Sequence, residues 1–357
     1  MRLRLDYDWG LWGLVLFLSL FGLFILGSAA PSQGYVLRQS LWLLIAIVLA
    51  AGLQLLDKPR LYRLAPWLYA LSILLLVGVL FFGREVNGAR AWFVFGPIRF
   101  QPSEFAKLAL ILMLARVLAT RPLERVWDYL VPLAIAALPV GLVAIEPDLG
   151  GAMVIAATAF GMFFARGIPW RHLIAAGAAA VVVFPTLVWP RLLPHQKERI
   201  LTALNPARDP LGSGFQVIQS MIAVGSGGIT GKGYGQGTQS QLGFVPFRHT
   251  DFIFAVVAEE MGLVGAGFLL FLYGLLFWRL VALAQQLPLL VDRLVVAGVF
   301  SLFAFQVLIN VGVTLGVAPV TGITLPFISY GGTSLVTLFL AVGLVELVYR
   351  DRVLGAV

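Results

Sequence analysis

The stretch RHTDFIFAVVAEEMG, residues 248–262, places a carboxylate at the start of a long apolar segment. Charged side chains in such segments are rare and usually functional, so Asp251 is a candidate for chemistry. Arg248, His249 and Thr250 precede it, and a partly desolvated carboxylate beside cationic groups can act as a general base. An aspartate at the start of a helix is also commonly a cap, and the residues alone leave both interpretations open.

A second polar group lies in QPSEFAKLAL, where another apolar segment begins. Ser103 is placed to cap a helix, and Glu104 would lie in its first turn, where the helix dipole favours an anion. Lys107 follows on the same face, which predicts a Glu104–Lys107 pair directed to the protein interior. The pair could be structural or could contact substrate. Gln101 and Arg90, just upstream, are further candidates, and Arg90 could hold an anionic head group.

Two carboxylates also stand close together in the short connection AIEPDLGGA. Glu146 and Asp148 flank a proline, and carboxylates at this spacing could share a divalent ion or a proton. Two ligands do not make a metal site, however. A cap on the next helix is the favoured role for Asp148 taken alone.

The run GSGGITGKGYGQGTQSQ, residues 225–241, is rich in glycine but matches neither the phosphate loop nor the dinucleotide fingerprint. Its backbone amides could still form a phosphate-binding nest to which Lys232 adds a charge, or the run could be a flexible lid. Glu259 and Glu260, which follow in the next apolar segment, are expected to be structural and to bond polar groups on adjacent segments.

The segment APVTGITLPFISYGGTSL, residues 318–335, interrupts the apolar pattern with prolines and glycines. Irregular backbone at membrane depth persists only where it is buried in protein or lines a wet cavity. We therefore expect this segment to wall an external cavity shared with the polar groups described above, with Ser329 and Tyr330 among the residues that bind or support substrate.

The composition identifies the bilayer as the solvent of this chain. Apolar residues make up 60% and charged residues 12%, against about 25% charged residues in soluble domains. Mean hydropathy is +0.94. The net charge of +8 comes from basic residues scattered singly between apolar runs, which is typical of topology determinants and excludes nucleic acid as a partner. Because there is no cysteine, disulfides and thiol nucleophiles are excluded.

At about 20 apolar residues per span, the sequence predicts an all-α polytopic membrane protein in a single domain, residues 1–357. About ten transmembrane helices are expected, at roughly 9–29, 37–56, 64–82, 103–119, 128–145, 150–165, 172–189, 251–278, 294–316 and 327–349. Arg and Lys concentrate in one set of connections, whereas the opposite short connections carry only Arg38, Arg84, Arg90 and Arg99. Both termini are therefore predicted to be cytoplasmic.

One long connection, residues about 190–250, is predicted to be external. It contains two amphipathic stretches, 195–210 and 214–224, and the second would place Phe215, Ile218 and Ile222 on one apolar face. Both stretches could lie in the plane of the outer leaflet or pack on the top of the bundle.

The polar stretches resemble the signature blocks of the SEDS family, named for shape, elongation, division and sporulation. The matching blocks are QPSEFAKLAL, EPDLGGA, DPLGSGFQVIQSMIAVGSGGITGKGYGQGTQSQLGFVP, RHTDFIFAVVAEE and LPFISYGGTSL, in the family's order. The run GKGYGQGTQSQLGFVPFRHTDFIF and the short termini are more similar to the elongation members than to the division members. Two positions depart from the pattern: Ala91, where a basic residue is frequent, and Gly151, where Thr is usual.

The resemblance implies a peptidoglycan glycosyltransferase that polymerises lipid II at the outer face of the cytoplasmic (inner) membrane. It also implies a class B penicillin-binding protein as the transpeptidase partner, together with other membrane proteins of the elongation complex. The family's essential aspartate falls on Asp251, and its Glu–Lys pair falls on Glu104 and Lys107. Asp251 would take the proton of the acceptor hydroxyl as that hydroxyl attacks the donor's anomeric carbon.

Charge would develop on the leaving polyprenyl pyrophosphate. Lys107, Arg90, Lys232 or a divalent cation, Mg or Mn, could stabilise it.

Two other classes of protein fit the same composition. A flippase for lipid-linked precursor would also carry ionisable residues in its spans, although alternating access favours polar groups through the midplane. A scaffold that only activates a penicillin-binding protein would use every charge structurally.

Overall fold

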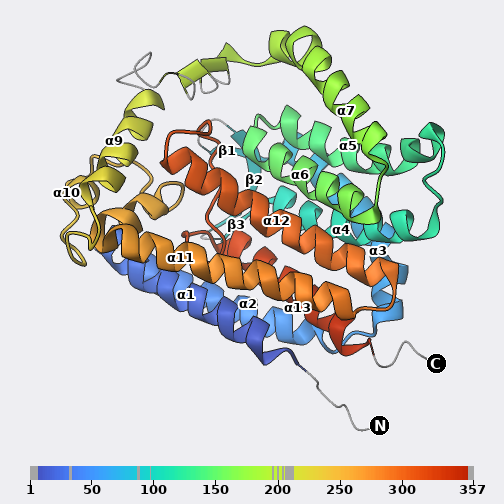
Figure 1. Ribbon diagram of the computed structural model, residues 1–357, viewed down its shortest axis with the longest axis horizontal. Coiled ribbons are helices and arrows are strands. Elements are labelled where there is room, and N and C mark those ends of the chain that lie inside the picture. Colours follow the sequence, from blue (N-terminus) through green and yellow to red (C-terminus); the bar gives the residue numbers. More distant parts are fainter. Residues whose placement is uncertain are drawn as a thin grey trace.

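The computed structural model of the protein describes most of the chain, namely residues 7–31, 34–86, 89–96, 98–194, 197–198, 201–202, 205 and 213–352. It is a bundle of long helices (Figure 1). The long helices are α1 (Trp9–Ala29), α2 (Tyr35–Leu53), α3 (Lys58–Phe82), α4 (Pro102–Thr120), α5 (Leu130–Ile145), α6 (Leu149–Arg166), α11 (Ile253–Gln286), α12 (Leu290–Thr314) and α13 (Gly332–Arg350).

Within the described residues, eight helices are long and apolar enough to cross a membrane. Of the ten predicted spans, the two without this character are 103–119 and 172–189. The first is α4, a full-length helix that packs against α3, α5, α6, α12 and α13. Because neighbouring helices rather than lipid surround α4, it can carry Glu104 and Lys107 in its first turns.

The span predicted at 172–189 is only partly α-helical. Helix α7 (Trp170–Val183) gives way to a π-helical turn, η2 (Phe184–Val188), and a 3-10 turn, η3 (Trp189–Arg191). Pro185 and Pro190 lack an amide hydrogen, so a regular α-helix cannot continue through this stretch without losing hydrogen bonds. A further 3-10 turn, η1 (Val126–Tyr129), precedes α5.

The two ends of the described chain meet at one end of the bundle. The amide of Asp8, the N-cap of α1, donates to the carboxylate of Glu346 in α13 at 3.1 Å. Asp8 also pairs with Arg279 near the end of α11. The first and last helices therefore begin and end on the same side, as the even number of predicted spans requires.

A small antiparallel sheet lies where the sequence was expected to form a loop. Its strands, β1 (Arg84–Val86), β2 (Ala89–Phe95) and β3 (Ile98–Phe100), follow one another in the order β1-β2-β3. Strand β2 contacts both α3 and α4. The sheet therefore connects these helices at the external end, where α4 begins.

The external connection contains α9 (Ser213–Ser226) and α10 (Thr238–Gln241), which Figure 1 shows at one end of the bundle. Helix α9 confirms the second amphipathic stretch, and it packs on the bundle through a face other than the predicted apolar one. Val217, Ser220 and Ala223 are buried, whereas Ile222 is exposed. The hydroxyl of Ser220 donates to the carbonyl of Thr314, which sets this face against α12. The stretch 195–210 lies mostly outside the described residues.

Helix α11 is interrupted at Gly262, whose φ of 65° and ψ of −164° are not helical. The glycine-rich loop replaces the hydrogen bonds lost at this break. Its amides at Lys232 and Gly233 donate to the carbonyls of Glu259 and Glu260, at 3.1 and 3.0 Å. On the other side of the break, the amides of residues 263 and 264 donate to the loop carbonyls of residues 228 and 229. The loop is thus built into α11 rather than covering it as a flexible lid.

Candidate active site

Asp251 lies in a turn that ends before α11 begins. The helix starts at Ile253 with Phe252 at the N-cap position, two residues after the predicted start of this span at residue 251. The amides of Thr250 and Phe252 both donate to the carbonyl of Phe247, which closes the chain into a turn here. Asp251 is half-buried and stands one residue before the helix cap.

Three consecutive backbone carbonyls of this turn, at residues 249–251, accept hydrogen bonds from the C-terminal part of the chain. The donors are the amide of Tyr330 at 2.9 Å, the hydroxyl of Ser329 at 2.6 Å and the side-chain amide of Asn310 at 2.8 Å. Part of the segment 318–335 therefore lies beside Asp251, whereas its role in walling a cavity stays a prediction. The backbone that carries this carboxylate is fixed at each of three successive peptides.

Aromatic rings pack on the same turn. The ring of Tyr35 stacks on His249 at 4.7 Å between centroids and lies 4.5 Å from the ring of Tyr330. Burial, together with the neighbouring charge of Arg248, lowers the pKa of His249, so its imidazole is neutral at pH 7. The guanidinium of Arg248 donates to the carbonyl of Ala29, which ties the turn to the end of α1.

The predicted Glu104–Lys107 pair is present, with Nζ 2.7 Å from the carboxylate oxygen and both side chains buried. The side-chain amide of Gln101 donates to Asp148 at 3.0 Å, so the starts of α4 and α6 are joined. Lys107 and Glu104 also act electrostatically on Asp148, in opposite directions. Four of the predicted site residues, from two connections, therefore form one group.

The prediction that Ser103 caps α4 is wrong. Gln101 occupies the N-cap position and Pro102 is the first helical residue, a position that suits proline because its missing amide hydrogen would have no helical partner. Asp148, in contrast, is the N-cap of α6 as predicted, and its carboxylate accepts from the amide of Gly151 at 2.8 Å.

Glu146 is fully buried beside Asp148, and within the described residues neither of its carboxylate oxygens has a hydrogen-bond partner. Burial, with a smaller contribution from the charge of Asp148, raises the pKa of Glu146 to about 8. The pKa of Asp148 is also raised, mainly by burial. Glu146 therefore carries a proton at neutral pH.

A Cβ on Gly151 would lie 2.5 Å from a carboxylate oxygen of Asp148, so the glycine leaves room for that carboxylate.

Residues 321–323 lie close both to Asp251 and to the start of α6. On one side, a Cβ on Gly150 would overlap the carbonyl oxygen of Thr321, so the start of α6 touches this segment directly. On the other side, a Cβ on Gly322 would lie 3.9 Å from a carboxylate oxygen of Asp251. One short piece of irregular backbone thus lies between Asp251 and the start of α6, the helix that Asp148 caps.

Lys232 is not part of this arrangement. Its ammonium pairs with Glu259 at 2.8 Å, and Glu259 also accepts from the loop amides of residues 239 and 240. Glu260 accepts from Ser28 of α1 at 2.5 Å and from Gln241 at 3.0 Å. These two glutamates hold the glycine-rich loop, which agrees with the structural role expected for them.

Arg90 is exposed on β2, with its Cα paired in register with that of Glu85 on β1. This position does not test whether Arg90 holds an anionic head group, so that role stays a prediction.

The expected divalent cation also stays a prediction. Within the part of the chain that the structure describes, no group of three or more His, Asp or Glu side chains could hold a metal ion.

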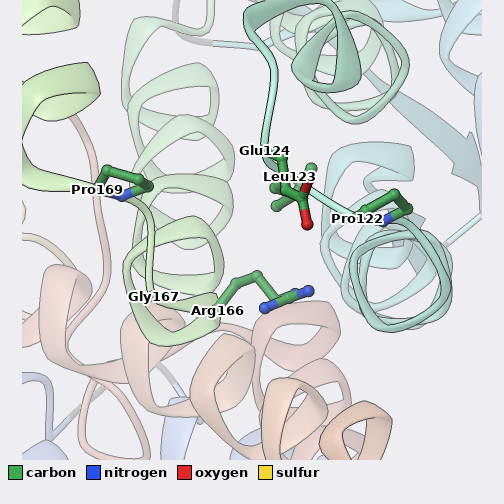
Figure 2. Close-up of a pocket in the computed structure, with 6 residues that line it drawn as sticks. All are labelled: Pro122, Leu123, Glu124, Arg166, Gly167 and Pro169. Carbon is green, nitrogen blue, oxygen red and sulfur yellow. The ribbon is translucent and has the colours of Figure 1, made fainter.

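A cavity of about 340 Å³ lies at the opposite ends of α4 and α6, far along these helices from Gln101 and Asp148. Figure 2 shows the side chain of Arg166 extending beneath the connection after α4. The lining residues are Pro122, Leu123, Glu124, Arg166, Gly167 and Pro169. None of the predicted site residues lines it, and Arg166 donates to the carbonyl of Leu118 at the end of α4.

A model of the cell cycle protein family that comprises FtsW, RodA and SpoVE matches residues 5–353. The chain belongs to the FtsW/RodA/SpoVE family. The resemblance to SEDS proteins drawn from the sequence blocks is confirmed, and with eight apolar helices this family member is a multi-pass protein of the inner membrane.

Two curated relatives of this family member are peptidoglycan glycosyltransferases by name. MrdB of Escherichia coli K12 is 42% identical over 297 residues, covering 82% of this chain and 80% of the relative. RodA of Treponema pallidum is 34% identical over 361 residues, covering 96% of this chain and 98% of the relative.

Two solved structures share the fold of this family member. The first, described as showing structural coordination of polymerization and crosslinking by a peptidoglycan synthase complex, contains a chain with a TM-score of 0.87 and 52% identity. That match covers 97% of this chain and 98% of the other. The second is rod shape determining protein RodA of Thermus thermophilus, with a TM-score of 0.76, 44% identity and 98% coverage of both chains.

Sequence reasoning missed Asn310, Gly322 and Tyr35. Asn310 had a visible signal, because an amide side chain inside the apolar run of α12 needs a polar partner. Gly322 and Tyr35 had none, since their proximity to Asp251 and His249 arises only when distant segments pack together.

Proposed function

We propose that this peptidoglycan glycosyltransferase polymerises lipid II at the outer face of the cytoplasmic membrane during cell elongation, with Asp251 as its general base. The glycosyltransferase activity and the elongation role follow from relatives such as MrdB and RodA. The observation that carries the site assignment is the position of residues 321–323, which lie close to Asp251 and touch the start of α6, the helix that Asp148 caps.

The reaction needs a base because a sugar hydroxyl is a weak nucleophile. Asp251 accepts the proton of the acceptor's 4-hydroxyl while that oxygen forms a bond to the anomeric carbon of the donor. The bond from this carbon to the pyrophosphate oxygen breaks, and its electron pair leaves with the polyprenyl pyrophosphate. A single displacement inverts the configuration at the anomeric carbon. General-base assistance of this kind contributes about 10²–10⁴-fold to the rate.

Charge on the departing pyrophosphate calls for a positive group. Lys107 is suited to this role because its ammonium is buried, where a charge acts more strongly than in water. Its pairing with Glu104 fixes its position before substrate arrives. The hydrogen bond from Gln101 to Asp148 holds the start of α6 against α4, and the start of α6 in turn touches residues 321–323.

We further propose a class B penicillin-binding protein as the partner that crosslinks the glycan strands. The similarity to a chain from a peptidoglycan synthase complex supports a partnership of polymerisation with crosslinking. Other membrane proteins of the elongation complex would bind the same assembly.

Reconstitution tests the function directly. The purified protein, alone and with its penicillin-binding partner, is supplied with labelled lipid II in liposomes, and glycan strands are separated by length. The proposal predicts strands from the complex and none from the partner alone. Movement of labelled lipid across the bilayer without polymer would instead identify a flippase. Polymer from the partner alone, unchanged when this chain is added, would make this chain a scaffold.

A further inference from the structure

Asn310 on α12 joins the Asp251 turn to the irregular segment that follows α12. One side-chain amide, Nδ2, lies 2.8 Å from the carbonyl oxygen of Asp251 and 2.8 Å from the carbonyl oxygen of Ile323. Because both neighbours are acceptors, the nitrogen and not the oxygen of this amide must face them. The two hydrogens of one side chain are therefore shared between the two backbone segments that meet beside the carboxylate.

The surroundings of Asn310 argue against a role in stability alone. The residue is almost fully buried, and within the described residues its side-chain oxygen has no hydrogen-bond partner. A buried polar atom without a partner weakens folding, and this cost accompanies the two hydrogen bonds that the side-chain nitrogen donates. What Asn310 supplies is a pair of donors at a fixed separation.

These donors act at a point where small displacements reach the carboxylate. Asn310 fixes the peptide that follows the Cα of Asp251, whereas Ser329 and Tyr330 fix the two preceding carbonyls. Without it, this peptide could rotate and residues 321–323 could move away from Asp251. A misplacement of about 1 Å at a reacting group can cost on the order of 10²-fold in rate.

We infer that Asn310 is a positioning residue for glycosyl transfer, fixing the direction in which the Asp251 carboxylate faces the acceptor hydroxyl. The inference rests on the proposed role of Asp251 as the base. It assigns Asn310 no contact with substrate. Its removal should therefore lower kcat and leave KM for lipid II nearly unchanged.

The test compares Asn310→Leu and Asn310→Asp with Gln306→Leu. Gln306 lies one turn earlier on α12, is equally buried and, among the described residues, also has an unpartnered side-chain oxygen, which makes it a matched control. Lipid II polymerisation by the complete complex is measured at several substrate concentrations and pH values, normalised to folded protein. We expect kcat to fall about 10–100-fold in both Asn310 variants. KM should change less than threefold, and Gln306→Leu should stay near wild type.

A readout beyond rate separates positioning from general damage. The acid limb of the pH–rate profile, which reports the base, should move in Asn310→Leu and stay in place in Gln306→Leu. Wild-type kcat in Asn310→Leu, or a rise in KM with unchanged kcat, would overturn the inference. Undiminished activity of Asp251→Asn, measured in parallel, would instead remove the proposed base itself, so the two failures are distinguishable.

Discussion

The ammonium of Lys232 lies 2.8 Å from the carboxylate of Glu259, and this pair ties the glycine-rich loop to the first turns of α11. Lys232 also donates to Thr238 at 2.8 Å, and its side chain is 25% exposed. The glycine-rich run was a candidate for phosphate binding, but its lysine instead contacts side chains of the protein itself. The loop that leads to Asp251 is thereby anchored to the helix that follows Asp251.

Replacing Lys232 should therefore affect folding more than chemistry. Lys232→Met leaves a buried carboxylate with backbone donors but no cation, and we expect a loss of about 1–3 kcal/mol in unfolding free energy. Thermal unfolding in detergent and protease cleavage within the loop measure the effect. The control is Lys197→Met, at a partly exposed lysine that donates to the carbonyl of Pro190. Loss of polymerisation with unchanged stability would return Lys232 to the substrate-binding role first predicted for it.

The buried Glu104–Lys107 pair can be tested by a double-mutant cycle. Lys107→Met alone leaves Glu104 buried without its cation, which should cost about 3–5 kcal/mol. Glu104→Gln combined with Lys107→Met removes both charges and should recover most of that stability. If Lys107 stabilises the leaving group, the stable double variant will still polymerise slowly. If the double variant recovered both the stability and the polymerisation rate of the wild type, the Glu104–Lys107 pair would have only a structural role.

The protonated state of Glu146 predicts a dependence of stability on pH. In the unfolded chain this carboxyl releases its proton near its ordinary pKa of 4.5, whereas the folded protein retains the proton up to a pKa of about 8. The contribution of Glu146 to the unfolding free energy is therefore fully present below pH 4.5 and is lost as the pH rises to 8. The loss is on the order of 5 kcal/mol at most.

Glu146→Gln should flatten this dependence and raise the melting temperature at pH 8, because the amide cannot ionise. Melting temperatures between pH 5 and 8.5 for the wild type, Glu146→Gln and the exposed control Glu85→Gln provide the measurement. A wild-type curve with the same slope as that of Glu146→Gln would show that Glu146 does not titrate in this range.

The insertion of the glycine-rich loop into α11 depends on close backbone approach at Gly231. Its φ is +81°, and an added Cβ would overlap the carbonyl oxygen of Glu260. Gly235 has a similar φ of +70° with open space around it, so Gly235→Ala reports the cost of the backbone conformation alone. Gly231→Ala should be the less stable of the two and should expose the loop to protease. Equal stability of the two variants would contradict the insertion.

Local rules were sufficient for part of the site. The three-residue spacing of Glu104 and Lys107 predicted their pair, and Asp148 after a proline predicted its cap, because both interactions lie within one helical turn. Hydropathy likewise located the helices, although α4 is shielded from lipid by its neighbours. The sequence did not show which face of α9 packs on the bundle, because the hydroxyl of a polar residue, Ser220, donates to the carbonyl of Thr314.

Local sequence patterns could not predict contacts between segments that are distant in the sequence. The separation between Asp251 and Asn310 is 59 residues, and their hydrogen bond exists only because residues 318–331 fold back between α12 and α13. The hairpin at residues 84–100 has the same origin, since its strands are short and pair between two helices. No periodicity in the sequence marks either feature.

The role of Asp251 is the central claim, and the initial rate of lipid II polymerisation by Asp251→Asn in the complete complex tests it most directly. The variant keeps the size of the side chain and the backbone hydrogen bonds of residues 249–251, so the protein should fold and bind its partner normally. We predict a fall of at least about 10²-fold in rate, with lipid II binding retained. A rate within twofold of wild type, at equal amounts of folded complex, would contradict the assignment of Asp251 as the general base.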